Sequence, residues 1–174
     1  MVEIIADSSF IINIAILNWL DLLCAIFNKV WITPTVKKET EKIKNLLKLD
    51  CITIIELSDE ENDIVNQYLK ELEKKFPGEH RGEIESLVVA NFRGIPLLIS
   101  DNFSPWYIKS KYSGIKVEIK RGIHFISMAI DEKIILIKNK EDLEHLIQKI
   151  RGFYPEKAIQ SIKKKIQFNF KRGK

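Results

Sequence analysis

The sequence predicts an α/β fold, a three-layer sandwich in which helices flank a mostly parallel central sheet of about five strands. Two observations support this prediction. Short apolar runs alternate with longer stretches of helical length along most of the chain. The short runs also contain few polar residues, which is typical of strands buried on both faces of a parallel sheet.

The elements follow from these patterns in chain order. Strands are expected at residues 2–6, 29–33, 51–57, 95–100 and 115–119. Helices are expected at residues 10–27, 34–49, 58–76, 82–92, 122–132, 139–150 and 155–166. Asp7-Ser8-Ser9 supplies N-cap chemistry for the first helix, and Pro34 suits the first turn of the second. Ser58 and Glu61 have the spacing of a capping box at the start of the third.

Length and composition predict one domain over residues 1–174, with a helical C-terminal extension from about residue 123 and a basic tail at residues 163–174. Apolar residues make up 45% of the chain and charged residues 30%, as in ordinary globular proteins. Cys24 and Cys51 are expected to be reduced core residues of an intracellular protein and not a disulfide. Because no apolar run approaches the roughly 20 residues of a membrane span, we expect a cytoplasmic protein with no membrane partner.

Charge is distributed unevenly along the chain. Residues 1–62 contain six Lys against ten Asp or Glu, whereas residues 163–174 contain six basic residues and no acid. This distribution suits an acidic pocket that holds metal beside a basic surface that attracts phosphates. The alternative for the tail is a solvated segment of a lysine-rich protein.

Four acids are expected to meet at one edge of the sheet. Asp7 and Asp101 each follow an apolar strand directly, and ligands of parallel sheets bind beyond the carboxyl ends of the strands. Glu39 and Glu83 lie in the first two turns of helices, and helices begin at this same edge. Carboxylates brought together repel one another, and hard divalent cations such as Mg²⁺ or Mn²⁺ relieve that repulsion. A pair of such ions holds an attacking water and a leaving oxygen in line across a phosphodiester.

Each acid taken alone has another explanation. Asp7 suits a helix N-cap, and Glu39 suits a solvated Lys-Glu helix. Glu83 and Glu85 are favourable charges at a helix N-terminus, and Asp101 begins a turn signal. Their common position at one edge favours the shared site.

Three stretches in this order match a known family: IIADSSFII, ITPTVKKETEKI and GEIESLVVANFRGIPLLISDN. The chain resembles the PIN-domain proteins, metal-dependent nucleases that include the toxins of VapC-type toxin–antitoxin pairs. Residues 122–162 resemble the tail of a stand-alone prokaryotic subgroup, so the resemblance covers nearly the whole chain.

The resemblance implies a set of functional residues. The catalytic metal ligands would be Asp7, Glu39, Glu83 and Asp101. Glu85 is a rival of Glu83 for the same role, because residues two apart in a helix point to different faces. Ser9 and Ser100 match hydroxyl positions that support the first and last acids. Many relatives have Asp where this chain has Glu83, and Asn102 replaces a second acid.

A stretch just after Asp101 combines aromatic and basic residues. Trp106 is expected to stack on bases and Lys109 and Lys111 to hold phosphates, as in proteins that bind single-stranded nucleic acid. The alternative for Trp106 is that it covers the sheet edge.

These observations predict a metal-dependent endoribonuclease that hydrolyses phosphodiester bonds, with RNA favoured over DNA and Mg²⁺ or Mn²⁺ as cofactor. The alternative is a catalytically weak or inactive PIN-fold module that binds nucleic acid or has a regulatory role. Glu83 in place of the common Asp, and Asn102 in place of a second acid, favour this alternative. A homodimer and an antitoxin-like protein are the candidate protein partners. The chain has no Gly-rich phosphate loop and no nucleophile elbow, which excludes Walker-type nucleotide hydrolysis and leaves acyl transfer without support.

Overall fold

The apolar runs form one five-stranded sheet in which every neighbouring pair is parallel. The computed structural model describes the backbone of residues 2–172 and the side chains of residues 3–167. The strands are β1 (Val2–Ala6), β2 (Phe27–Ile32), β3 (Ile52–Ile54), β4 (Leu97–Ile99) and β5 (Glu118–Lys120). Their order is β3-β2-β1-β4-β5, so the first strand lies at the centre of the sheet.

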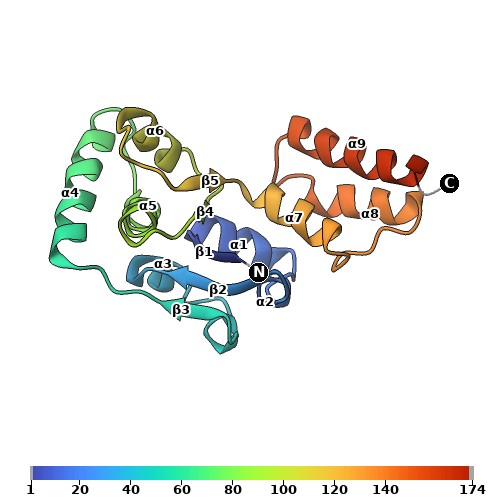
Figure 1. The fold of residues 1–174 in the computed structure, drawn as a ribbon, viewed down its shortest axis with the longest axis horizontal. Coiled ribbons are helices and arrows are strands. Elements are labelled where there is room, and N and C mark those ends of the chain that lie inside the picture. The colour runs from blue at the N-terminus through green and yellow to red at the C-terminus, as the bar shows by residue number, and fades with distance from the viewer. Residues whose placement is uncertain (1, 173–174) are drawn as a thin grey trace. The chain divides into compact units, whose positions relative to one another are not determined.

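The chain divides into two compact units, Met1–Gly122 and Ile123–Lys174. The sheet and most of the helices belong to the first unit. Those helices are α1 (Ser8–Ile16), α2 (Asp21–Ile26), α3 (Pro34–Glu39), the 3-10 turn η1 (Leu46–Lys48), α4 (Asp59–Glu73), α5 (Arg81–Arg93) and α6 (Ser104–Lys111). Figure 1 shows α4, α5 and α6 on one side of the sheet and α1 and α2 on the other, which confirms the predicted α/β sandwich.

One row of strand side chains forms the core against α5. Ile5 pairs with Leu98 across β1 and β4, and Leu98 pairs with Ile119 across β4 and β5. These side chains lie in one buried cluster with Ile84 and Leu87 of α5, each of which is fully buried. Burial of such side chains contributes about 1.5–3 kcal/mol each, so α5 is held firmly on the centre of the sheet.

The carboxyl ends of the central strands lie side by side. The Asp7 backbone N–H donates to the Ile99 carbonyl at 3.2 Å, and the Ser100 N–H donates to the Lys120 carbonyl at 2.9 Å. Asp7 and Ser100 therefore leave the sheet at the same edge, as the parallel arrangement predicts.

Two helices are shorter than the sequence pattern predicted. The expected helix at residues 10–27 breaks where Asn18 adopts a positive φ of 54°, and its last residue begins β2. The expected helix at residues 34–49 ends at Glu39 with Thr40 as its C-cap, and Asn45 turns left-handed at φ 70°. The Thr40 hydroxyl also donates to the Val36 carbonyl at 2.7 Å. Ser, Thr and Asn favour helix ends and turns through such local bonds, and apolar periodicity does not register them.

The prediction of reduced cysteines was wrong, since Cys24 of α2 and Cys51 just before β3 form a disulfide. Their Cα atoms lie 5.3 Å apart, within the range a disulfide needs. The early end of α3 brings the chain back to the sheet edge beside α2, a long-range approach that sequence spacing does not reveal.

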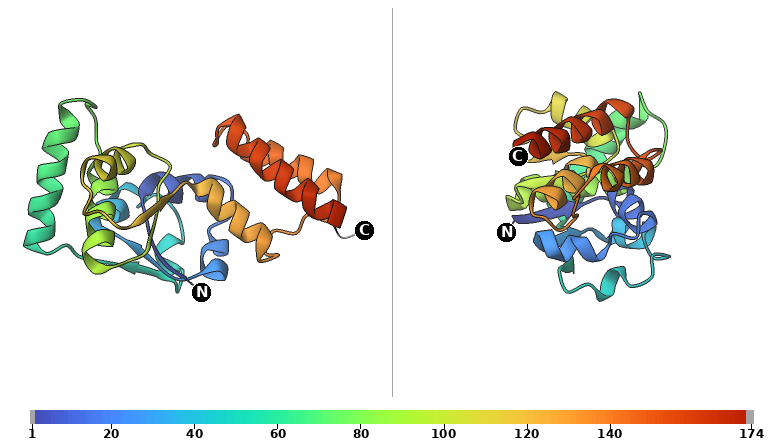
Figure 2. Two further views of the ribbon diagram at one scale, coloured as in Figure 1. Left: turned by 45° about the horizontal axis from the view of Figure 1, so that its top comes forward. Right: turned by 90° about the vertical axis from the view of Figure 1, so that its right-hand side faces the viewer.

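The second unit is helical, with α7 (Gly122–Asp131) starting at the boundary, followed by α8 (Lys140–Ile150) and α9 (Glu156–Arg172). Both views of Figure 2 show α8 and α9 running alongside each other. Lys165 of α9 forms an ion pair with Asp131 and donates to the Ser127 hydroxyl at 2.7 Å, which ties α9 to α7. The basic tail is helical to residue 172, and its side chains from residue 168 onward lie outside the described residues.

Within the part of the chain that the structure describes, no helix combines the length and the apolar character that crossing a membrane requires.

Candidate active site

Asp7 connects the end of β1 to the start of α1. As the N-cap of α1 its Oδ1 accepts from the Phe10 N–H at 3.0 Å and from the Ser9 hydroxyl at 2.8 Å. Its Oδ2 accepts from the Ser100 hydroxyl across the β1–β4 junction. Asp7 is therefore both the predicted N-cap and a fixed carboxylate at the sheet edge.

Burial dominates the electrostatics of Asp7. The residue is completely buried, and the loss of hydration raises its pKa from 3.8 to about 7. Hydrogen bonds from Ser100, Phe10 and Ser9 act in the opposite direction, and the Glu83 carboxylate raises the pKa further. A nearby cation would stabilise the charged form of such a buried carboxylate.

Asp101 is joined to Asp7 through a single hydroxyl. The Ser9 Oγ that donates to Asp7 also accepts from the Asp101 backbone N–H at 3.1 Å. The Asp101 side chain accepts from Asn13 Nδ2 of α1 and from the Gly122 N–H, each at 2.9 Å. Two acids 94 positions apart are thus held by one turn of α1.

A second hydroxyl joins Asp7 to Glu83 of α5. Ser100 Oγ donates to Asp7 and accepts from the Asn102 backbone N–H at 3.3 Å. The Asn102 side-chain amide in turn donates to Glu83 Oε1. Hydrogen bonds therefore connect Glu83, Asn102, Ser100, Asp7, Ser9 and Asp101 in one chain, which we call the acidic relay.

Glu83 has an oxygen with no hydrogen-bond partner. The residue is 6% exposed, and its Oε2 is buried with no donor, although His80 Nδ1 lies 3.5 Å away. Burial raises the pKa of Glu83, while His80 and the hydrogen bond from Asn102 oppose the shift and the Glu39 carboxylate adds to it. An unpartnered carboxylate oxygen in a buried position is costly unless a ligand meets it.

Glu39 lies at the C-terminal end of α3, against the first turn of α5. It is exposed, and a Cβ atom at Gly82 would lie only 2.7 Å from Glu39 Oε2. Gly82 therefore permits the Glu39 carboxylate to lie directly beside Glu83. The structure thus places the Glu39 carboxylate next to the turn of α5 that carries Glu83.

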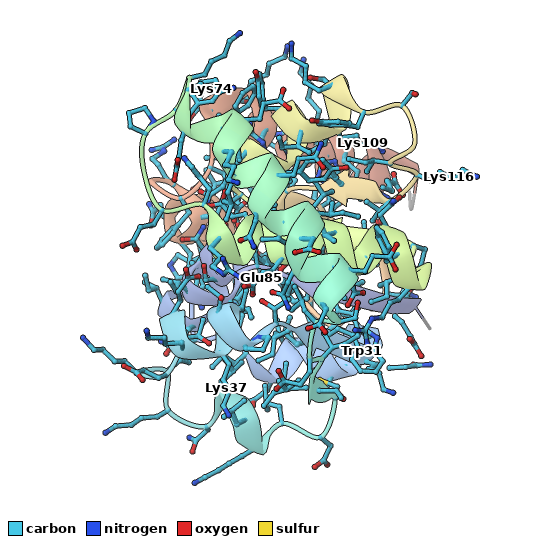
Figure 3. All side chains as sticks on the ribbon, turned by 90° about the vertical axis from the view of Figure 1, so that its left-hand side faces the viewer. Trp31, Lys37, Lys74, Glu85, Lys109 and Lys116 are labelled. Atoms are coloured by element: carbon cyan, nitrogen blue, oxygen red, sulfur yellow. A yellow bond between two sulfur atoms is a disulfide. The ribbon has the colours of Figure 1, made fainter. Side chains whose placement is uncertain are left out.

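Glu85 belongs to a different network. Its Oε1 accepts from Thr35 Oγ1 of α3 and from Arg81 Nε, each at 2.8 Å. Figure 3 labels Glu85 between the ribbons of α4 and α3. Arg81 also donates to Asn62 and Asn66 of α4, so Glu85 is part of a contact that fastens α5 to its neighbours.

A divalent metal ion needs several oxygen ligands close together. In residues 2–172, no group of three or more His, Cys, Asp or Glu side chains is placed to hold a metal ion. The chemistry of the donors nevertheless fits a hard cation, because the edge presents carboxylate oxygens, one of them buried and unpartnered at Glu83. The Glu83 carboxylate raises the pKa of Asp7 and the Glu39 carboxylate raises the pKa of Glu83, a repulsion that a cation would relieve.

The predicted nucleic-acid-binding residues lie on α6. Trp106 packs against the core cluster, in line with the alternative that it covers the sheet. The Lys109 ammonium donates to the Val117 carbonyl at 2.5 Å. Figure 3 labels Lys109 beside the ribbon of α6. Lys111 extends over the Tyr107 ring, with its nitrogen 5.6 Å from the ring centroid.

Sequence reasoning missed two aromatic residues next to the acids. Phe76, just beyond α4, and Phe103, just before α6, both line a pocket that contains Glu83 and Asn102. The signal was available for Phe103, which stands two residues after Asp101. No sequence signal pointed to Phe76, because its approach to the acids depends on the three-dimensional path of the turn that follows α4.

Comparison with known proteins gives a family. The family model described as a PIN domain matches residues 3–167, which is nearly the whole chain. No curated protein matches the sequence. The match agrees with the parallel sheet and with acids at its carboxyl edge, and PIN domains are generally nucleases. The chain belongs to the PIN-domain family.

Proposed function

We propose that this protein is a metal-dependent endoribonuclease that hydrolyses phosphodiester bonds at the carboxyl edge of its sheet. The observation that carries the proposal is the acidic relay, in which two hydroxyl groups join acids from β1, α5 and the end of β4. A purely structural set of carboxylates would be expected to find cationic partners, yet Asp7 is held only by neutral donors.

Each acid has a distinct part in the proposed reaction. Asp7, Glu83 and Asp101 would hold Mg²⁺ or Mn²⁺, and Glu39 would join them across Gly82. The ions would supply a nucleophilic water at neutral pH and neutralise charge on the phosphate. Ser9 and Ser100 orient the carboxylates, and such supporting groups matter because they fix ligands before substrate arrives.

Two features support RNA as the substrate class. The first is the resemblance to toxin ribonucleases in the stretches that contain the acids. The second is a pair of lysines, Lys75 and Lys111, whose nitrogens lie 5.7 and 5.6 Å from the centroid of the Tyr107 ring. Such residues provide salt-dependent affinity for phosphates.

A cleavage assay with labelled single-stranded RNA and Mn²⁺ tests the proposal. We expect cleavage by the wild type and its loss in Asp7→Asn and in Asp101→Asn, with unchanged circular dichroism. Asp50→Asn is the matched control, since Asp50 is an exposed Asp outside the relay. Equal cleavage by all four proteins would contradict the assignment.

A non-catalytic PIN-fold module is the second candidate. Asn102 favours it, because an amide occupies the place of a second acid and already donates to Glu83. RNA binding without metal-dependent cleavage by the folded wild type would support this candidate against the nuclease.

The expectations of a homodimer, an antitoxin-like partner and a cytoplasmic location remain predictions. Light scattering on the purified protein distinguishes a dimer from a monomer. The Cys24–Cys51 disulfide bears on location, because such bonds are rare in the cytosol of mesophiles and common in intracellular proteins of hyperthermophiles.

A further inference from the structure

A pocket opens directly beside the acidic relay. Its volume is about 330 Å³, within the range of small-ligand sites. It is lined by Phe76, Glu79, His80, Glu83, Asn102, Phe103 and Ser104. Two of these residues belong to the relay, so whatever occupies the pocket lies next to the proposed reaction.

One residue of the pocket lining, Ser104, is suited to bind an anion. Ser104 is the first residue of α6 and is 5% exposed, yet its hydroxyl has no hydrogen-bond partner. The preceding Phe103 makes no side-chain cap, and the N-terminus of a helix carries partial positive charge. His80 also lines the pocket, where its Nε2 contacts the Phe76 carbonyl at 3.1 Å and its Nδ1 lies 3.5 Å from Glu83 Oε2. A phosphate oxygen would satisfy the buried Ser104 hydroxyl.

The pocket lining also contains two exposed aromatic rings. Phe103 is 57% exposed and Phe76 is 37% exposed, with ring centroids 5.8 Å apart. Tyr107 continues the cluster at 5.2 Å from Phe76, and the nitrogens of Lys75 and Lys111 lie 5.7 and 5.6 Å from its ring centroid. Exposed aromatic rings flanked by lysines are how proteins bind unpaired bases without sequence preference.

We propose that this pocket binds one unpaired nucleotide next to the phosphodiester held at the acidic relay. The base lies against Phe103 and Phe76, and its phosphate is bound by the Ser104 hydroxyl and the N-terminus of α6. A base in a duplex is stacked and paired and does not reach these rings. The pocket therefore selects single-stranded RNA, an inference that rests on the proposed nuclease function.

Fluorescence anisotropy tests this proposal without cleavage. A labelled single-stranded RNA and its duplex are titrated with the full chain in EDTA. Phe103→Ala should weaken single-strand binding roughly tenfold, the scale of one lost stacking contact, and Ser104→Ala should also weaken it. Phe92→Ala is the matched control, because Phe92 is a similarly exposed Phe, at 44%, near the other end of α5. The duplex should bind more weakly than the single strand and should not respond to Phe103→Ala.

The outcomes separate this proposal from the nuclease assignment. If Phe103→Ala binds single-stranded RNA as wild type does, the pocket proposal is overturned even where Asp7→Asn abolishes cleavage. If the same variant loses single-strand affinity while no protein cleaves RNA with Mn²⁺, the pocket stands and the nuclease assignment fails.

Discussion

Asp7 illustrates how a fully buried carboxylate can oppose folding. Its pKa of about 7 in the folded protein lies above the 3.8 of an exposed Asp. Below pH 3.8 the carboxyl is protonated in both states, and between 3.8 and about 7 only the unfolded chain releases the proton. The contribution of Asp7 to metal-free stability should therefore fall as pH rises through this window and then level off.

The first prediction concerns Asp7→Asn, which cannot ionise. In EDTA its free energy of unfolding should exceed that of the wild type by an amount that grows from pH 4 to pH 7, with an upper limit of about 4 kcal/mol. Urea unfolding at several pH values measures this difference. A difference between the two proteins that does not change with pH would show that the burial of Asp7 has no such effect.

The second prediction separates Glu83 from Glu85. Glu83→Gln removes the charge of the carboxylate that Asn102 and Ser100 connect to Asp7, so Mn²⁺ binding should be lost while the fold remains. Glu85→Gln weakens the ion pair with Arg81 and should lower the melting temperature but keep Mn²⁺ binding. Calorimetric titration and thermal unfolding of both variants provide the comparison, and the opposite result would make Glu85 the ligand.

At the scale of elements, the approach of α3 to α5 depends on the absence of a side chain at Gly82. We expect Gly82→Ala to push the flexible Glu39 carboxylate away, because the new Cβ would lie 2.7 Å from its Oε2. Stability should hold or rise slightly, since Ala suits a helix better than Gly, while Mn²⁺ affinity falls roughly tenfold. Gly114→Ala is the control, as a Cβ there meets no atom within 4 Å. Unchanged affinity in Gly82→Ala would remove Glu39 from the site.

The disulfide links Cys24 of α2 to Cys51, the residue just before β3. It closes a loop with a sequence separation of 27, and the chain-entropy model assigns such a loop about 3 kcal/mol. Reduction should therefore lower the urea midpoint of the wild type. A Cys24→Ser, Cys51→Ser double variant should unfold at the reduced midpoint with or without reductant. Identical midpoints for oxidised and reduced wild type would mean that the bond adds no stability.

For the whole molecule, the sequence was sufficient to predict the sheet and the edge at which the acids meet. Parallel strands produce that edge through topology alone, so Asp7 and Asp101 could be assigned to it without coordinates. Glu39 instead ends the short helix α3, and its place beside α5 depends on the space that Gly82 leaves. The family match is consistent with this reasoning.

Other features depended on three-dimensional contacts. The Cys24–Cys51 disulfide and the pocket around Phe76 join segments whose approach depends on where α3 and α4 end. α3 ends at Glu39 beside Thr40, whose hydroxyl bonds to the backbone, and apolar periodicity does not detect such local bonds. The distinction between Glu83 and Glu85 likewise depends on which neighbours each side chain contacts.

The most direct test of the central claim is a calorimetric titration of Mn²⁺ into the wild type, Asp7→Asn, Asp101→Asn and the control Asp50→Asn. Saturable binding to the wild type and the control, lost in the two relay variants, would show that acids from β1 and the end of β4 share one ion site. Saturable binding that survives in both relay variants, or no binding to the folded wild type, would contradict it.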